Sequence, residues 1–157
     1  MSCAVALEGF YISGRYIAKE LTILFGSDNY QHFMFNNPDN LTYSDNAYSI
    51  VKYTQKLNGL SLANDCFLPY SIIGSILDNI QNYRIYTAGN QAEGFLSSYL
   101  PHSEVIDICE FYNFTYPLQL PPAQCFIKHP PRYCSLAKAI VIKSTTDNIL
   151  QEISQWL

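Results

Sequence analysis

Cys3 to Ile12 read CAVALEGFYI, Ser13 and Gly14 follow, and Arg15 to Phe25 read RYIAKELTILF. Small, β-branched and aromatic residues dominate both long segments, as is typical of strands buried in a sheet. The Ser-Gly pair between them suits the tight turn of a hairpin. Residues 30–35, YQHFMF, form a third strand candidate that stops at the sequence Asn-Asn-Pro-Asp. Three strands in close succession predict an antiparallel meander at the start of the chain.

After Pro38 the hydrophobic pattern changes to a helical period, with apolar residues three and four positions apart. We expect helices at 45–57, 69–82, 89–100, 122–128, 135–143 and 147–157, and strands at 84–87 and 104–109. Three antiparallel strands, followed by helices that alternate with parallel strands, form the order of a ribonuclease-H-like fold. This is an α/β fold with a mixed five-stranded sheet flanked by helices. We expect one domain over residues 1–157, because no repeat, low-complexity tract or linker divides the chain.

The composition narrows the function classes. The chain has 157 residues, of which 48% are hydrophobic and 14% charged, so it is typical of a globular protein rather than a disordered one. The formal net charge of -4 argues against a general nucleic-acid binder, which usually presents a basic face. A local basic patch in the last third remains a candidate, with an ordinary solvated helix face as the alternative. Its residues are Lys128, His129, Arg132, Lys138 and Lys143.

The sequence also indicates where in the cell the protein is expected. No apolar run approaches the roughly 18 residues that a membrane span needs, and the N-terminal residues lack the basic start of a signal peptide. We therefore expect an intracellular protein with no membrane partner. Five cysteines at irregular positions do not form a disulfide framework. Three of them are most simply small buried hydrophobic residues, namely Cys3, Cys66 and Cys109.

The densest group of metal-ligating residues lies near the C-terminus, where Cys125, His129 and Cys134 follow the pattern C-x3-H-x4-C. Thiolate and imidazole are preferred zinc donors, and a closed structural site normally has four ligands. A short helix over 122–128 would place Cys125 and His129 on one face, and the following Pro-Pro pair would turn the chain. Cys134 would then precede the next helix, whose dipole favours a thiolate. The alternative is two core cysteines and an unrelated surface histidine.

A fourth donor must come from elsewhere, and Glu20 is the candidate because it lies inside an otherwise apolar strand segment. A buried carboxylate is costly unless it is paired or coordinates a metal. Strand alternation places Glu20, Thr22 and Leu24 on one face. The alternative is that this face is partly exposed and Glu20 is solvated. His32 on the third strand segment is expected to be a core or surface histidine, and His102 to face solvent.

Several short segments can be compared as a set with known families: Glu8-Gly-Phe10, Ile17-Ala-Lys-Glu-Leu-Thr-Ile23, Asn58-Gly-Leu60, Tyr86-Thr-Ala-Gly89 and Ser135-Leu-Ala-Lys-Ala139. Together with the Cys-His-Cys run before the last of them, they resemble the maelstrom domain. That family is similar in fold to DEDDh exonucleases and has a characteristic Glu-Cys-His-Cys zinc cluster. The resemblance implies zinc as cofactor and implies as its ligands Glu20, Cys125, His129 and Cys134.

The same resemblance raises the hypothesis of an exonuclease, which would hold two magnesium ions with four acidic residues. The Asp-x-Glu of the first strand corresponds here to Ala6-Leu-Glu8, and Glu93 is the nearest match for the middle aspartate. The histidine of the last motif corresponds to His129, and its aspartate corresponds to Cys134. Neither a methyl group nor a thiol suits magnesium, which prefers oxygen ligands. These positions therefore predict a degenerate catalytic site, in which Glu8 and Glu93 are solvated or helix-capping acids.

We therefore expect a zinc-stabilised, non-catalytic module that binds RNA or protein in piRNA-type transposon silencing, a pathway that comes from the resemblance alone. The expected partners are single-stranded RNA, contacted by Lys128, Arg132 and Lys138, and silencing-pathway proteins, with no small-molecule substrate. The expected location is the cytoplasm, in perinuclear granules, or the nucleus. Two alternatives stay open. One is a DEDDh-like or metal-independent ribonuclease, and the other is a pure protein-interaction module of host, mobile-element or viral origin.

Overall fold

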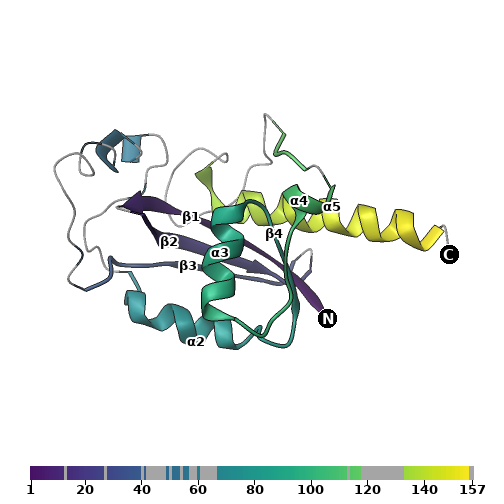
Figure 1. The fold of residues 1–157 in the computed structure, drawn as a ribbon, viewed down its shortest axis with the longest axis horizontal. Helices are drawn as coiled ribbons and strands as arrows, with labels where there is room; N and C mark the ends of the chain where they lie inside the picture. Colours follow the sequence, from purple (N-terminus) through teal and green to yellow (C-terminus); the bar gives the residue numbers. More distant parts are fainter. Residues whose placement is uncertain are drawn as a thin grey trace.

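The structure is a computed structural model, and it describes residues 1–12, 14–26, 28–39, 41, 49, 51–53, 55–56, 60, 67–112, 114–117 and 133–155. Within these residues the chain is an α/β protein with a five-stranded mixed sheet and helices on both faces (Figure 1). The α/β class and the mixed five-stranded sheet predicted from the sequence are confirmed. No helix in the described ranges is long and apolar enough to cross a membrane.

The sheet has the strand order β3-β2-β1-β4-β5. The three N-terminal strands, β1 (Ser2–Ile12), β2 (Arg15–Leu24) and β3 (Tyr30–Met34), form the predicted antiparallel meander. Strands β4 (Arg84–Thr87) and β5 (Val105–Asp107) add to the other edge of β1, and both pair in parallel. The longest strand, β1, therefore lies at the centre and contacts both the meander and the parallel part.

A β-bulge in the hairpin of β1 and β2 sets which residues of the two strands lie opposite each other. Glu8 lies opposite Glu20, whereas Gly9 lies opposite Ala18, so Lys19 is the extra residue of β2. Gly9 permits this because a Cβ atom there would lie 2.0 Å from the carbonyl oxygen of Ile17. The Nζ of Lys19 donates a hydrogen bond of 2.9 Å to Oδ1 of Asn37. The bulge thus aligns two carboxylates across neighbouring strands.

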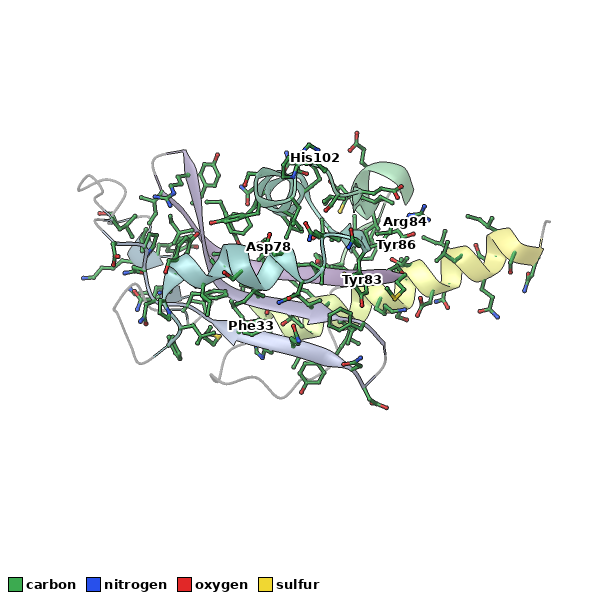
Figure 2. All side chains as sticks on the ribbon, turned by 90° about the horizontal axis from the view of Figure 1, so that it is seen from below. Phe33, Asp78, Tyr83, Arg84, Tyr86 and His102 are labelled. Carbon is green, nitrogen blue, oxygen red and sulfur yellow. The ribbon has the colours of Figure 1, made fainter. Side chains whose placement is uncertain are left out.

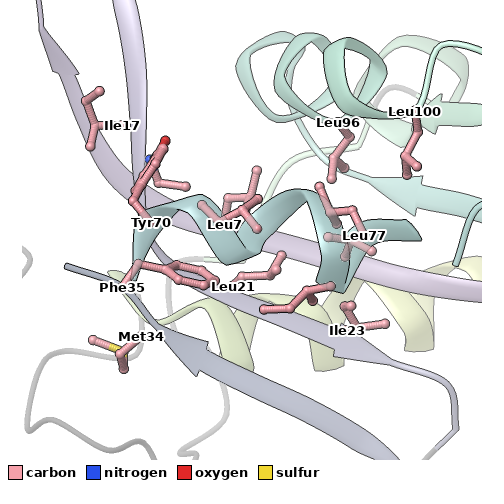
Figure 3. Close-up of a cluster of buried hydrophobic side chains, with 14 of the residues drawn as sticks. Leu7, Ile17, Leu21, Ile23, Met34, Phe35, Tyr70, Leu77, Leu96 and Leu100 are labelled. Carbon is pink, nitrogen blue, oxygen red and sulfur yellow. The ribbon is translucent and has the colours of Figure 1, made fainter. Parts of the chain in front are cut away.

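The main hydrophobic core lies between the sheet and two helices, α2 (Ile73–Asp78) and α3 (Asn90–Tyr99). Figure 3 shows Leu77 of α2 and Leu96 of α3 pointing toward the sheet, where Leu7 and Leu21 lie. All of these side chains are at most 8% exposed. A 3-10 helix, η1 (Tyr70–Ile72), leads directly into α2. Alternate residues of β1 and β2 build this face, as period-two alternation predicts.

The opposite face of the sheet is covered by α5 (Ser135–Gln155), which contacts β1, β2 and β4. Ala139 and Ile142 of this helix pack against Ala4, Leu24 and Tyr86. Both views show the C-terminal part of α5 continuing past the end of the sheet (Figures 1 and 2). The short helix α4 (Ile108–Tyr112) follows β5 and contributes Ile108 to this second core.

Two C-terminal predictions were wrong in their boundaries. The two helices expected at 135–143 and 147–157 are one helix through Gln155, since no Gly or Pro interrupts residues 144–146. Thr146 bonds back to the carbonyl of Ile142 and Lys143 pairs with Asp147, so the junction is well supported. The strand expected at 104–109 ends at Asp107. Its carboxylate accepts the N–H of Cys109 and thereby starts α4 instead.

Two predicted helices in the first half of the chain have different outcomes. The helix expected at 69–82 becomes η1 and α2 and ends at Asp78, because i to i+3 turn bonds replace the helical pattern over residues 79–83. In the range 45–57, the described residues 49, 51–53 and 55–56 are helical. The helix expected at 122–128 lies outside the described residues.

Candidate functional site

The first candidate site surrounds Glu20, which is fully buried in β2 on the face covered by α5. The backbone N–H of Ser135, the first residue of α5, donates a hydrogen bond to Oε1 of Glu20. Next to this contact, the hydroxyl oxygens of Thr22 and Ser135 lie 2.8 Å apart and share a hydrogen bond. Glu20 is therefore not solvated, and its negative charge lies at the N-terminus of α5, where the helix dipole favours it.

His32 approaches the same carboxylate from β3, where it pairs with Thr22 in the sheet register. Its Nε2 atom lies 3.6 Å from Oε1 of Glu20, and its side chain is 3% exposed. At this separation the two groups attract each other when the imidazole is protonated. From the sequence, either a core or a surface histidine is expected at His32, and the structure shows a buried side chain. The sequence did not predict its proximity to Glu20.

Cys134 lies immediately before α5 and is 2% exposed. Its carbonyl oxygen accepts the N–H of Lys138 at 3.0 Å, so it takes the cap position of the helix, as its place in the sequence suggests. Since Glu20 bonds the next residue, Ser135, the structure brings the two predicted ligands Glu20 and Cys134 to the same helix end. The other two predicted ligands, Cys125 and His129, lie outside the described residues. Among the residues that are described, no group of three His, Cys, Asp or Glu side chains converges.

A second polar cluster lies one helical turn along α5. Lys138 forms an ion pair with Oε1 of Glu8 on β1, and its Nζ lies 5.3 Å from the centroid of the Tyr116 ring. Burial, and next the charge of Glu8, raise the pKa of the Tyr116 hydroxyl. A cavity of about 230 Å³ opens beside this cluster, and Glu8, Lys138 and Asn90 are among the residues that line it.

The other residues of the predicted degenerate site do not join this cluster. Ala6 is buried in the core beneath α5, so its methyl group packs rather than coordinates. Glu93 lies in the first turn of α3 and accepts a hydrogen bond of 3.0 Å from the hydroxyl of Ser97 on the same helix. The expected role as a solvated or helix-capping acid was wrong for Glu8, which is buried and paired with Lys138, and Glu93 is half-buried rather than solvated.

The sequence did not single out Asp107, which is 7% exposed at the end of β5. Its Oδ1 accepts the backbone N–H of Gly89 at 2.8 Å and that of Cys109 at 3.0 Å. Burial, and next the charge of Asp107, raise the pKa of the Cys109 thiol. An aspartate between a strand and a helix is a recognisable capping signal, so this residue could have been identified.

The RNA contacts expected for Lys128, Arg132 and Lys138 stay a prediction. Lys138 is engaged with Glu8 and Tyr116, whereas Lys128 and Arg132 lie outside the described residues. His102 is exposed in the turn after α3, as expected (Figure 2).

Comparisons of the chain with protein-family models, with curated proteins and with solved structures give no match.

Proposed function

We propose that this chain is a maelstrom-like domain with a ribonuclease-H-like fold, stabilised by one zinc ion and acting as a binding module rather than as a nuclease. The observation that carries the proposal is the buried carboxylate of Glu20, held at the first residue of α5 directly after Cys134. The strand order, with an antiparallel meander followed by two parallel strands, supports the fold assignment.

The residues at this helix end have the chemistry that zinc prefers. The carboxylate of Glu20 contacts the first residue of α5, and Cys134 directly precedes that residue, so Glu20 and Cys134 would supply two ligands. The proposed third and fourth ligands are Cys125 and His129, from the Cys-His-Cys run. Buried His32 lies 3.6 Å from the Glu20 carboxylate, beside the proposed ligands. Bound zinc would tie β2 to the C-terminal part of the chain, and its binding energy would contribute to folding.

The second polar cluster supports a non-catalytic role. Two-metal nucleases need several acidic oxygens directed at one point, and they hold those acids for the metal ions. Here Glu8 is paired with Lys138, so the ammonium group neutralises the carboxylate without a metal ion. Two further aligned positions carry the methyl group of Ala6 and the thiol of Cys134 instead of acids. The proposed partners, single-stranded RNA and proteins of piRNA-type silencing in the cytoplasm or nucleus, rest on the family resemblance.

Metal content tests the zinc site. Protein purified without chelator is expected to contain one zinc per chain by mass spectrometry, and both Glu20→Gln and Cys134→Ala are expected to lose it. The matched control is Cys3→Ala, since Cys3 is an equally buried cysteine in the core on the other face of the sheet. It should keep the metal. Zinc-free wild-type protein that melts at the same temperature with and without chelator would exclude the site.

A nuclease assay separates the proposal from its main alternative. Labelled single-stranded RNA and DNA are incubated with the protein in magnesium or manganese, and no cleavage above the buffer control is expected. Robust cleavage that Glu8→Gln abolishes would instead establish a ribonuclease. Binding to the same RNA at low salt, without cleavage, is the result that the binding module predicts. Absence of RNA binding, with zinc retained, would favour the pure protein-interaction module.

A further inference from the structure

A larger cavity, of about 640 Å³, lies at the turn end of the hairpin of β1 and β2. Its volume is in the range of small-ligand sites. The hairpin contributes Tyr11, Arg15 and Tyr16, and α3 contributes Phe95 and Tyr99. It is thus separate from the Glu20 site, which lies under α5 on the other face of the sheet.

Aromatic rings form one wall of this cavity, and their mutual packing fixes them. Tyr16 meets Phe95 edge to face with ring centroids 5.7 Å apart, and Phe95 meets Tyr99 with centroids 5.1 Å apart. Tyr70 also lines the cavity, and its hydroxyl accepts the N–H of Ala18 at 3.2 Å. The outer rings remain accessible, since Tyr11 is 53% and Tyr99 36% exposed. The cavity therefore offers accessible ring surfaces to a planar ligand, and that of Tyr99 is held in place by Phe95.

The polar residues of the cavity indicate what kind of planar ligand fits. Arg15 is the only charged side chain among the described lining residues, and it forms no ion pair with another described residue. A guanidinium group beside the rings disfavours a cationic guest and favours one that carries a phosphate. The amide side chains of Asn90 and Gln91 provide both donors and acceptors, as base edges require.

We propose that this aromatic cavity binds an unstacked nucleotide of single-stranded RNA, with its base against the tyrosine wall and its phosphate at Arg15. Stacking on aromatic rings next to an arginine is the general means by which proteins hold single strands without reading their sequence. It also accounts for RNA binding by a chain with net charge -4, because one cation and several rings replace a broad basic face. The inference rests on the proposed RNA-binding function and assigns it a location.

Fluorescence anisotropy with a labelled 12-nucleotide oligouridine at low salt tests the inference on the full chain. Tyr11→Ala is expected to weaken binding about 10-fold, because it removes one stacking surface. Arg15→Gln is expected to weaken it by a similar factor and to lower the slope of log K against log salt by about one. An oligomer with abasic sites should bind wild type and Tyr11→Ala alike, since it has no base to stack.

The matched control is Tyr30→Ala, because Tyr30 is 45% exposed at the start of β3 and does not line the cavity. It should bind like wild type, and all variants should keep the wild-type melting temperature. If wild type binds RNA and neither Tyr11→Ala nor Arg15→Gln changes the affinity, the cavity assignment is wrong while the RNA-binding function stands. If wild type binds no RNA at low salt, both are overturned, and the zinc measurement still reports separately on the metal site.

Discussion

The two faces of strands β1 and β2 differ sharply although they alternate along the same residues. Toward α2 and α3 the central parts of the strands present apolar side chains, such as Leu7 and Leu21. Toward α5 they present two carboxylates and a hydroxyl, from Glu8, Glu20 and Thr22, all buried. Each of these polar groups has a partner on α5, and the described residues contain no buried side-chain N or O atom without a hydrogen bond.

The two faces therefore differ in how much their side chains contribute to the stability of the fold. Burial of apolar surface stabilises a fold by about 25 cal/mol per Å² and needs no particular partner. Buried ion pairs often give no net stability compared with hydrocarbon of the same shape, because desolvation offsets the attraction. The α5 face therefore needs another reason for its polar residues, and the proposed zinc site at Glu20 provides one.

The largest expected effect comes from the apolar face. Leu21→Ala should lower the free energy of unfolding by about 2–5 kcal/mol, because Leu21 is fully buried and its loss leaves a cavity. Urea unfolding followed by circular dichroism measures this change. The zinc content of the folded fraction should stay at the wild-type value. Loss of zinc from Leu21→Ala that is still folded would show that the two faces are not independent.

The sequence predicts features that depend on residues close together in the chain, and it does not predict contacts between residues that are far apart in the chain. The meander was predicted because strand alternation and the turn near Gly14 are local signals. Alternation also placed Glu20 and Thr22 on one face, but it could not show what covers that face. Helix α5 covers this face. Its residue Ser135, which bonds Glu20, is 115 positions away in the chain, and Lys138, which pairs with Glu8, is 130 positions away.

The remaining differences between prediction and structure also have physical causes. Asp107 ends its strand through side-chain hydrogen bonds to nearby backbone, which compete with the apolar pattern around it. The aromatic cavity was not predicted, since its rings come from a hairpin and from α3, and each segment alone has an ordinary mixed pattern. Contacts between distant segments are therefore the part that sequence patterns leave open.

A smaller effect is expected from Thr22, which tests whether the polar face is held together by its hydrogen bonds. Thr22→Val keeps the shape of the side chain but removes the hydroxyl that bonds Ser135. It should lower the free energy of unfolding by about 1–2 kcal/mol, the usual cost of a buried hydrogen bond whose other partner stays in place. A double-mutant cycle with Ser135→Ala measures the coupling. Additive losses would contradict a direct interaction between the two hydroxyls.

The smallest effect concerns pH and the one cysteine on the apolar face of β1. Burial raises the pKa of the Cys3 thiol from 9.0 to about 12, because the apolar core disfavours the charged thiolate. A raised pKa in the folded state gives stability that is complete below pH 9 and is lost as the pH rises toward 12. Between pH 9 and pH 10 the free energy of unfolding of wild type should fall by about 1 kcal/mol more than that of Cys3→Ala.

Urea unfolding of both proteins at the two pH values isolates this difference. The effect of tyrosines such as Tyr16, whose pKa is also raised by burial, is the same in wild type and variant and cancels. Parallel pH profiles for the two proteins would mean that the apolar face accommodates a thiolate. In that case the two faces would differ in their residues but not in their tolerance of charge, and charged groups on these strands would not need the partners on α5.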